Sequence, residues 1–181
     1  MEKHLYALPN RCTGCNRCTY ACSAAKEGMF IPTRARIKVS NFSLEGYSVP
    51  HVCFQCPKAS CAEACPEEAI FRNSRGVVVV DAAKCNGCGV CVAACPYGMI
   101  EQYISGKAYK CDLCGGDPLC VAECHYGAIV FKESDKIAQN QRNQQMKQRI
   151  KHDDPQAKRL TLAVNIRDAA QRVPRSAGYL G

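Results

Sequence analysis

The spacing of the cysteines constrains this chain more than any other feature of its sequence. Sixteen cysteines occur among 181 residues, and they fall into four groups of four with none left over. Every group begins with a C-x2-C pair and ends with a C-x3-C step, while the middle gap is two, four, two and five residues in turn. The groups are Cys12, Cys15, Cys18 and Cys22; Cys53, Cys56, Cys61 and Cys65; Cys85, Cys88, Cys91 and Cys95; and Cys111, Cys114, Cys120 and Cys124.

The third group shows which metal centre suits this spacing. Residues 85–96 read C-x2-C-x2-C-x3-C-P, a run typical of [4Fe–4S] sites in which the fourth cysteine reaches a second cluster. Gly87 and Gly89 allow the loop backbone to approach the sulfurs. A structural zinc site usually uses two C-x2-C pairs separated by a dozen or more residues, and reduced cytosolic thiols disfavour disulfides. We therefore expect four [4Fe–4S] clusters, with all sixteen cysteines as iron ligands, rather than zinc ions or a disulfide framework.

The charge of the chain does not indicate nucleic-acid binding. The formal net charge of +8 counts every thiol as neutral, whereas an oxidised cluster with its four thiolates carries roughly −2. Four such sites offset the basic excess. No apolar run is long enough to cross a bilayer, and the first nine residues lack the apolar core of a signal peptide. We expect a cytoplasmic protein without a membrane span, although a partner subunit could carry an export signal for both.

Short strands are expected beside the cysteine groups. The segments that follow the second, third and fourth groups resemble one another, which indicates duplicated units. Residues 76–81 form a β-branched run between turn residues, and 70–72 and 129–131 are expected to be partner strands.

A small hairpin is expected between the first two groups. Residues 31–39 alternate apolar and basic side chains, as a half-buried strand does, and 42–49 form a candidate second strand. Gly46 is expected at or near a turn.

The carboxy-terminal region differs in composition from the rest. Residues 132–159 are charged and rich in Gln and Asn, which indicates an extended or loosely helical tether. A helix ending at Pro174 is then expected, because apolar residues recur at helical spacing at Leu162, Ile166, Ala169, Ala170 and Val173. Such a helix must dock, either on its own body or on another subunit, and the long tether favours another subunit.

Few other side chains suggest chemistry. Lys84 and Lys110 each precede a cluster loop, where they could raise a cluster potential or simply be solvated. His4, His51 and His152 are expected at the surface. Since there is no nucleophile–base pair, phosphate loop or dinucleotide fingerprint, we expect no catalytic residue in this chain.

The second and fourth groups resemble a known family. The motifs 110–114 (KCDLC) and 53–56 (CFQC), with their x4 and x5 gaps, are similar to four-[4Fe–4S] ferredoxin-type electron-transfer subunits of molybdenum and tungsten oxidoreductases. The resemblance covers residues 1 to about 132. Residues 22–37 look most like the small iron–sulfur subunit of tungsten aldehyde oxidoreductase complexes, and like ferredoxins associated with carbon monoxide dehydrogenase. Ser23 and His125 depart from the family, which often has Pro after the last ligand.

The resemblance implies an α+β fold of two nested bacterial dicluster ferredoxin-like units with a carboxy-terminal helical tail. The outer unit would comprise residues 1–33 and 102–133, and the inner unit residues 50–101. The hairpin insert would span 34–49, and the tether and docking helix 134–181.

The resemblance also favours a nested exchange of ligands. Sequential pairing of the first group with the second, and the third with the fourth, is the alternative. In the nested arrangement the four clusters would be held by Cys12, Cys15, Cys18 and Cys124; by Cys22, Cys111, Cys114 and Cys120; by Cys53, Cys56, Cys61 and Cys95; and by Cys65, Cys85, Cys88 and Cys91.

The function that the resemblance implies is electron transfer, with catalysis in a partner. Single electrons would pass through the four clusters between a tungsten- or molybdenum-pterin catalytic subunit of the aldehyde oxidoreductase type and a flavin subunit or ferredoxin. Self-association through the tail is a further expectation. Two alternatives stay open: a free polyferredoxin carrier, for example for carbon monoxide dehydrogenase or hydrogenase, and a cluster-delivery assembly protein.

Overall fold

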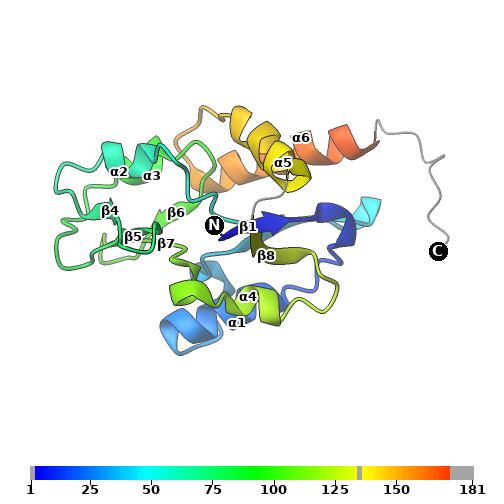
Figure 1. Ribbon diagram of the computed structural model, residues 1–181, viewed down its shortest axis with the longest axis horizontal. Coiled ribbons are helices and arrows are strands. Elements are labelled where there is room, and N and C mark those ends of the chain that lie inside the picture. The colour runs from blue at the N-terminus through cyan, green and yellow to red at the C-terminus, as the bar shows by residue number, and fades with distance from the viewer. Residues whose placement is uncertain (1–2, 134–135, 172–181) are drawn as a thin grey trace.

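The computed structural model describes residues 3–133 and 136–171. In these ranges the chain forms short helices and four separate antiparallel strand pairs, a mixed helix-and-strand architecture (Figure 1). The pairs are β1 (Lys3–Ala7) with β8 (Ile129–Glu133), β2 (Lys38–Phe42) with β3 (Tyr47–His51), β4 (Ile70–Arg72) with β5 (Val78–Val80), and β6 (Ile100–Gln102) with β7 (Ala108–Lys110). The helices are α1 (Arg17–Glu27), α2 (Ser60–Glu63), α3 (Val90–Ala94), α4 (Leu119–Ala122), α5 (Lys136–Lys147) and α6 (Pro155–Gln171).

Two apolar cores organise these elements. One core lies among α2, α3 and the β4–β5 and β6–β7 pairs, and it includes Phe54, Ile70 and Ile100. The other lies among α1, α4 and the β1–β8 pair, and it includes Leu5 and Ile129. Helix α1 packs against α4, and α2 packs against α3 (Figure 1). Cysteine side chains contribute to both cores: Cys53, Cys91 and Cys95 are buried in the first, and Cys18, Cys22 and Cys120 in the second.

The strand predictions are confirmed in part. Residues 70–72 pair with 78–80 as expected. The segment 129–131 pairs instead with β1, in a register that places Leu5 opposite Phe131, so the two ends of the body meet in one ribbon.

The predicted hairpin is present, but its first strand begins later than expected. Strand β2 begins at Lys38, and a 3₁₀ turn at Pro32–Arg34 occupies the preceding segment. Pro32 has no N–H for a strand ladder and favours a turn. Gly46 lies at the hairpin turn with φ 62°.

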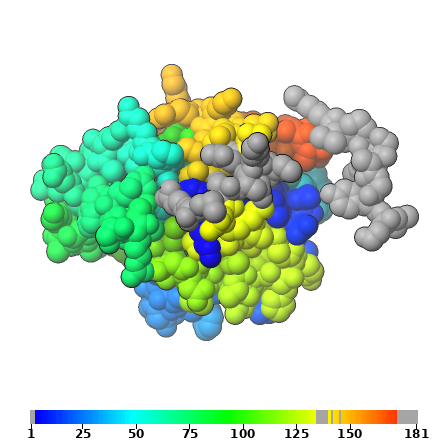
Figure 2. Space-filling model, in the orientation of Figure 1, coloured from blue at the N-terminus to red at the C-terminus, as the bar shows by residue number. Residues whose placement is uncertain are grey.

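The carboxy-terminal region is not the tether that its composition predicts. Strand β8 extends to Glu133, and helices α5 and α6 occupy most of the described residues after it. Both helices lie on the body (Figure 2), and α6 contacts β2 and β3. The segment 136–171 is called the strap below.

The buried face of α6 also differs from the prediction. Its buried residues are Lys158, Arg159, Leu162 and Ala163, whereas Ala169 and Ala170 are exposed. The prediction is confirmed for Leu162 and wrong for Ala169 and Ala170. Two basic side chains are buried against carbonyl oxygens of the body instead, which an apolar pattern does not reveal. The expected positions Val173 and Pro174 lie outside the described residues. None of the helices in the described ranges is long and apolar enough to cross a membrane.

Candidate metal centres

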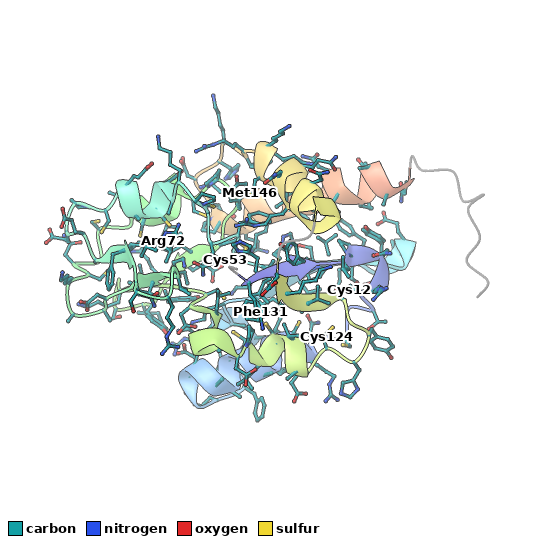
Figure 3. All side chains as sticks on the ribbon, in the orientation of Figure 1. Cys12, Cys53, Arg72, Cys124, Phe131 and Met146 are labelled. Atoms are coloured by element: carbon teal, nitrogen blue, oxygen red, sulfur yellow. The ribbon has the colours of Figure 1, made fainter. Side chains whose placement is uncertain are left out.

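The fold gathers the cysteine side chains into four sets, each containing three residues of one group and one residue of another. In three of the sets the four cysteines line one cavity: set II is Cys22, Cys111, Cys114 and Cys120, set III is Cys53, Cys56, Cys61 and Cys95, and set IV is Cys65, Cys85, Cys88 and Cys91. Set I is Cys12, Cys15, Cys18 and Cys124, in which the charged forms of the other three raise the pKa of Cys18. Figure 3 shows Cys12 and Cys124 of set I on the same side of the molecule, with Cys53 of set III nearer its middle.

Burial and mutual repulsion make these thiols weak acids while no cation is nearby. Burial, followed by the charges of neighbouring cysteines, raises the pKa of Cys18 to about 12 and that of Cys61 to about 12. The same two causes raise the pKa of Cys91 to about 11. A metal centre needs thiolates, so the positive charge of bound iron must compensate for this cost. Four thiols gathered in an apolar interior therefore suit a cationic cluster core.

Three of the sets line cavities with apolar walls. The cavity of set III is also bounded by Phe54 and Ile100, that of set II by Leu5 and Ile37, and that of set IV by Ile70. Within residues 3–133 and 136–171, no three His, Cys, Asp or Glu side chains are arranged to hold a single metal ion. A [4Fe–4S] core differs from such a site in having four iron corners, each of which takes one thiolate.

Backbone N–H groups point at several of the sulfurs. Such hydrogen bonds are a usual means of stabilising thiolates and tuning cluster potentials. The donors and sulfur acceptors are Arg36 N and Cys22 at 3.2 Å, Ala128 N and Cys124 at 3.2 Å, Met99 N and Cys95 at 3.4 Å, Ala108 N and Cys85 at 3.4 Å, and Leu113 N and Cys111 at 3.5 Å. With these donors and the cavities, the residues present fit iron–sulfur clusters.

The four sets follow one another through the molecule. Sets I and II meet where Cys18 and Cys120 interact, and sets II and III meet where Cys53 and Cys111 interact. Sets III and IV share helix α3, which has Cys91 in its first turn and Cys95 at its end. Among the sixteen cysteines, all within the described ranges, Cys15 and Cys88 are the exposed ones. The exposed thiols therefore belong to the two end sets, I and IV.

The two lysines that precede cluster loops lie in different surroundings. Lys84 is exposed. Lys110 is buried, and its ammonium group donates hydrogen bonds to the carbonyl oxygens of Val78 and Cys111. Its positive charge lowers the pKa of Cys61 against the effect of burial.

One of the histidines expected at the surface is buried. His51 is 4 % exposed, and its Nε2 lies 2.9 Å from the hydroxyl of Ser40. Burial and the charge of Arg159 lower the pKa of His51 to about 3, so the ring is neutral. The surface prediction was wrong because α6 covers β3, which carries His51. His125 and His152 are exposed.

Three functional candidates were missed by the sequence analysis. Lys158 and Arg142 of the strap and Gln55 of the second cysteine group are all buried close to cysteines or to their backbone. Gln55 alone offered a signal, because it stands inside the motif C-F-Q-C; the two strap residues lie in a segment whose composition gave none.

Comparison with known families agrees with the expected cofactor. A family profile described as a 4Fe-4S dicluster domain matches residues 44–134, half of the chain, and one described as a 4Fe-4S binding domain matches residues 9–25. The chain binds [4Fe–4S] clusters, and its sixteen cysteines fit four of them.

Several curated proteins are similar to this chain over part of its length. The aliphatic sulfonate oxidoreductase, polyferredoxin-like subunit of Pyrococcus furiosus is 42 % identical over 58 % of this chain and 61 % of that protein. A tetrathionate reductase subunit of Archaeoglobus fulgidus is 35 % identical over 62 % of this chain and 55 % of that protein. The chain thus spans less than two thirds of the length of either relative.

Among solved structures, the active site complex BamBC of benzoyl coenzyme A reductase in complex with benzoyl-CoA contains a similar chain. The two chains are 23 % identical with a TM-score of 0.43, over 94 % of this chain and 97 % of that one. This superposition is too loose to carry a conclusion.

Proposed function

Because the chain belongs to the 4Fe-4S dicluster domain family, we propose that it is the electron-transfer subunit of an oxidoreductase complex. When bound, the clusters supply one-electron chemistry, and the protein sets their distances, insulation and potentials. The observation that carries the proposal is the order of the four cysteine sets, in which each set adjoins the next and the two end sets hold the exposed thiols. An arrangement of this kind is what a relay between two partners needs.

The proposal assigns one cluster to each of the four sets, by nested exchange of the fourth ligand. The contacts of α1 with α4 and of α2 with α3 support it, because they place the first cysteine group beside the fourth and the second beside the third. On this basis the outer unit comprises residues 1–33 and 102–133 and the inner unit residues 50–101, with the hairpin insert at 34–49.

The proposed partner at one end is a catalytic subunit that carries a tungsten- or molybdenum-pterin centre, of the aldehyde oxidoreductase type. At the other end the electrons pass to a flavin subunit or a ferredoxin. The names of the relatives support a complex, since one is a subunit of an aliphatic sulfonate oxidoreductase and another of a tetrathionate reductase. The surfaces around Cys15 and Cys88 are the contact points for these two partners. We place the complex in the cytoplasm.

Anaerobic co-purification of the full-length chain tests this function. We expect an oxidoreductase subunit containing tungsten or molybdenum to co-purify, and its substrate to bleach the visible absorbance of the clusters within the complex. A chain that elutes alone and exchanges electrons with soluble partners would instead be a free carrier. A chain that passes its clusters to an apo-acceptor would be an assembly protein. Either result would contradict the proposal.

Removal of the tail is not a clean test of complex formation. The described part of the tail lies on the body and covers residues beside set III, so its deletion would expose that set as well as remove any docking segment. Single substitutions at the exposed ends of the relay avoid this problem. Self-association through the tail remains part of the proposal, and the end of the tail, residues 172–181, lies outside the described residues.

A further inference from the structure

Buried basic side chains lie beside set III. Lys158 is 1 % exposed, and its ammonium group donates to the carbonyl oxygens of Ala93 at 2.7 Å, Cys95 at 2.9 Å and Val92 at 3.3 Å. These carbonyls end helix α3, where a cation also interacts favourably with the helix dipole. Within the part of the chain that the structure describes, no carboxylate forms an ion pair with Lys158.

Arg142 brings a second cation to the same set. Its guanidinium is buried and donates to the carbonyl oxygens of Phe54 and, at 3.5 Å, Gln55. Its Nε is buried without a hydrogen-bond partner in the described structure. A buried charge without an opposite charge is costly, so an anion close by would stabilise this arrangement.

The anion that these cations face is the thiolate set itself. Lys158 donates to the carbonyl oxygen of Cys95, and Arg142 donates to those of Phe54 and Gln55, the two residues between Cys53 and Cys56. Lys110 lines the cavity of set III. Three buried cations therefore lie beside set III, and two of them come from the strap.

Cations from outside the strap also lie beside the neighbouring sets. Lys110 donates to the carbonyl oxygen of Cys111 of set II at 2.8 Å, and Lys107 donates to the carbonyl oxygen of Cys85 of set IV at 2.6 Å. Lys26, a further lysine beside set II, is paired with Asp112 at 2.7 Å. Set III differs in having two buried cations from the strap in addition to Lys110.

We propose that Lys158 and Arg142 of the strap are positioning residues that raise the reduction potential of the cluster held by Cys53, Cys56, Cys61 and Cys95. Reduction adds one negative charge to the cluster, and a buried cation stabilises that charge more than a solvated one does. The third cluster of the relay is then easier to reduce than it would be without the strap. The inference rests on the proposed assignment of one cluster to each set.

The test is an anaerobic redox titration of the full-length chain, followed by electron paramagnetic resonance and visible absorbance. In Lys158→Met and in Arg142→Gln we expect one of the four couples to move to more negative potential. At the potential that is the wild-type midpoint, the ratio of reduced to oxidised cluster should be about tenfold lower in the variant. This ratio corresponds to a midpoint shift of ~59 mV for a one-electron couple. Arg142→Lys keeps the charge and should restore the wild-type midpoint.

Arg159→Gln is the matched control. Arg159 neighbours Lys158 on α6 and also holds the strap, through the carbonyl oxygen of Gly98 and an ion pair with Glu101 at 2.7 Å. Its charge is already paired, so this variant should weaken the strap without moving a cluster potential. Equal shifts in the control and in Lys158→Met would show that strap packing, not charge, sets the potential, and would overturn the proposal.

Two further results separate this inference from the function on which it rests. Cys56→Ser should perturb the same couple that Lys158→Met shifts. If Lys158→Met and Arg142→Gln leave all midpoints unchanged, or shift a couple that Cys56→Ser does not affect, the inference fails and the relay stands. If the wild-type chain has fewer than four couples, the proposed function fails before any variant is compared. The iron content of every variant is measured, so that a variant that has lost the cluster is recognised. If Lys158→Met loses the cluster and Arg142→Gln leaves all midpoints unchanged, the inference is also contradicted.

Discussion

The side-chain amide of Gln55 donates a hydrogen bond to the carbonyl oxygen of Cys111 at 2.8 Å. Its side-chain oxygen accepts one from the backbone N–H of Val78 at 2.9 Å. Gln55 is 4 % exposed, and its backbone has φ 48°, which few residues other than glycine adopt. One buried side chain therefore joins the second cysteine group to the fourth, at the place where sets II and III meet.

Gln55→Leu should destabilise this junction. The substitution leaves the carbonyl of Cys111 and the N–H of Val78 without their partner, at a cost of about 1–3 kcal/mol for each group that stays buried. Anaerobic thermal unfolding, followed by loss of cluster absorbance, measures the effect. The exposed Gln156 on α6 provides the control, since Gln156→Leu should change stability little. Equal stability of the two variants would contradict the role of Gln55.

Gly98→Ala should displace the strap from the body. Gly98 has φ +64°, and an added Cβ would lie 2.2 Å from the carbonyl oxygen of Pro155, the first residue of α6. Gly28→Ala is the matched control, because Gly28 has φ +70° but nothing within 4 Å of the added atom. We expect several-fold faster tryptic cleavage after the exposed Lys151 in Gly98→Ala than in Gly28→Ala. Similar rates would mean that the close approach at Gly98 is unimportant.

The attachment of α6 through Glu101 should not depend on pH between 5.5 and 8. Burial raises the pKa of Glu101, but hydrogen bonds from Lys38 and Tyr109 and the charge of Arg159 lower it below its usual 4.5 overall. A carboxylate with a lowered pKa contributes stability that is present above 4.5 and is lost only as the pH falls through the folded-state value. Glu101→Gln should therefore speed cleavage of the strap by the same factor throughout this range.

The comparison of Glu101→Gln with the wild type at each pH provides the control, because it cancels the pH dependence of the protease. If the difference between the two proteins disappears by pH 6, Glu101 is protonated there and the ion pairs with Lys38 and Arg159 do not hold α6.

Paired serine substitutions separate nested from sequential ligand exchange. In the nested arrangement Cys12 and Cys124 hold the same cluster, so the double variant should lose no more iron than either single variant. Cys12 and Cys65 belong to different sets, so that double variant should lose the iron of two clusters. Sequential exchange predicts the reverse for these two pairs. Iron analysis of anaerobically prepared protein distinguishes the two arrangements.

The sequence predicts the parts of the fold that local chemistry dictates. The C-x2-C spacing places thiols on tight loops, and the β-branched run at 78–80 forms a strand paired with 70–72. Gly46 marks the hairpin turn because a positive φ is required there. In each of these cases the residues that carry the signal are close together in the chain.

The strap could not be predicted in the same way. Its contacts depend on buried cations. The periodicity of apolar residues does not predict that a lysine such as Lys158 is buried, where its ammonium group donates hydrogen bonds to three backbone carbonyl oxygens. Lysines are rarely fully buried, so the charged, Gln- and Asn-rich composition of this region indicates an extended or loosely helical tether. The pairing of β1 with β8 was missed for a related reason, because these strands are separated by almost the whole body.

Iron and sulfide analysis of the anaerobically purified full-length chain, combined with electron paramagnetic resonance of the reduced protein, tests the central claim most directly. Four clusters in a row predict roughly sixteen irons and sixteen sulfides per chain, and spectra of the fully reduced protein broadened by magnetic interaction between neighbouring clusters. Zinc in place of iron, markedly less iron, or four spectra without interaction would contradict a continuous relay.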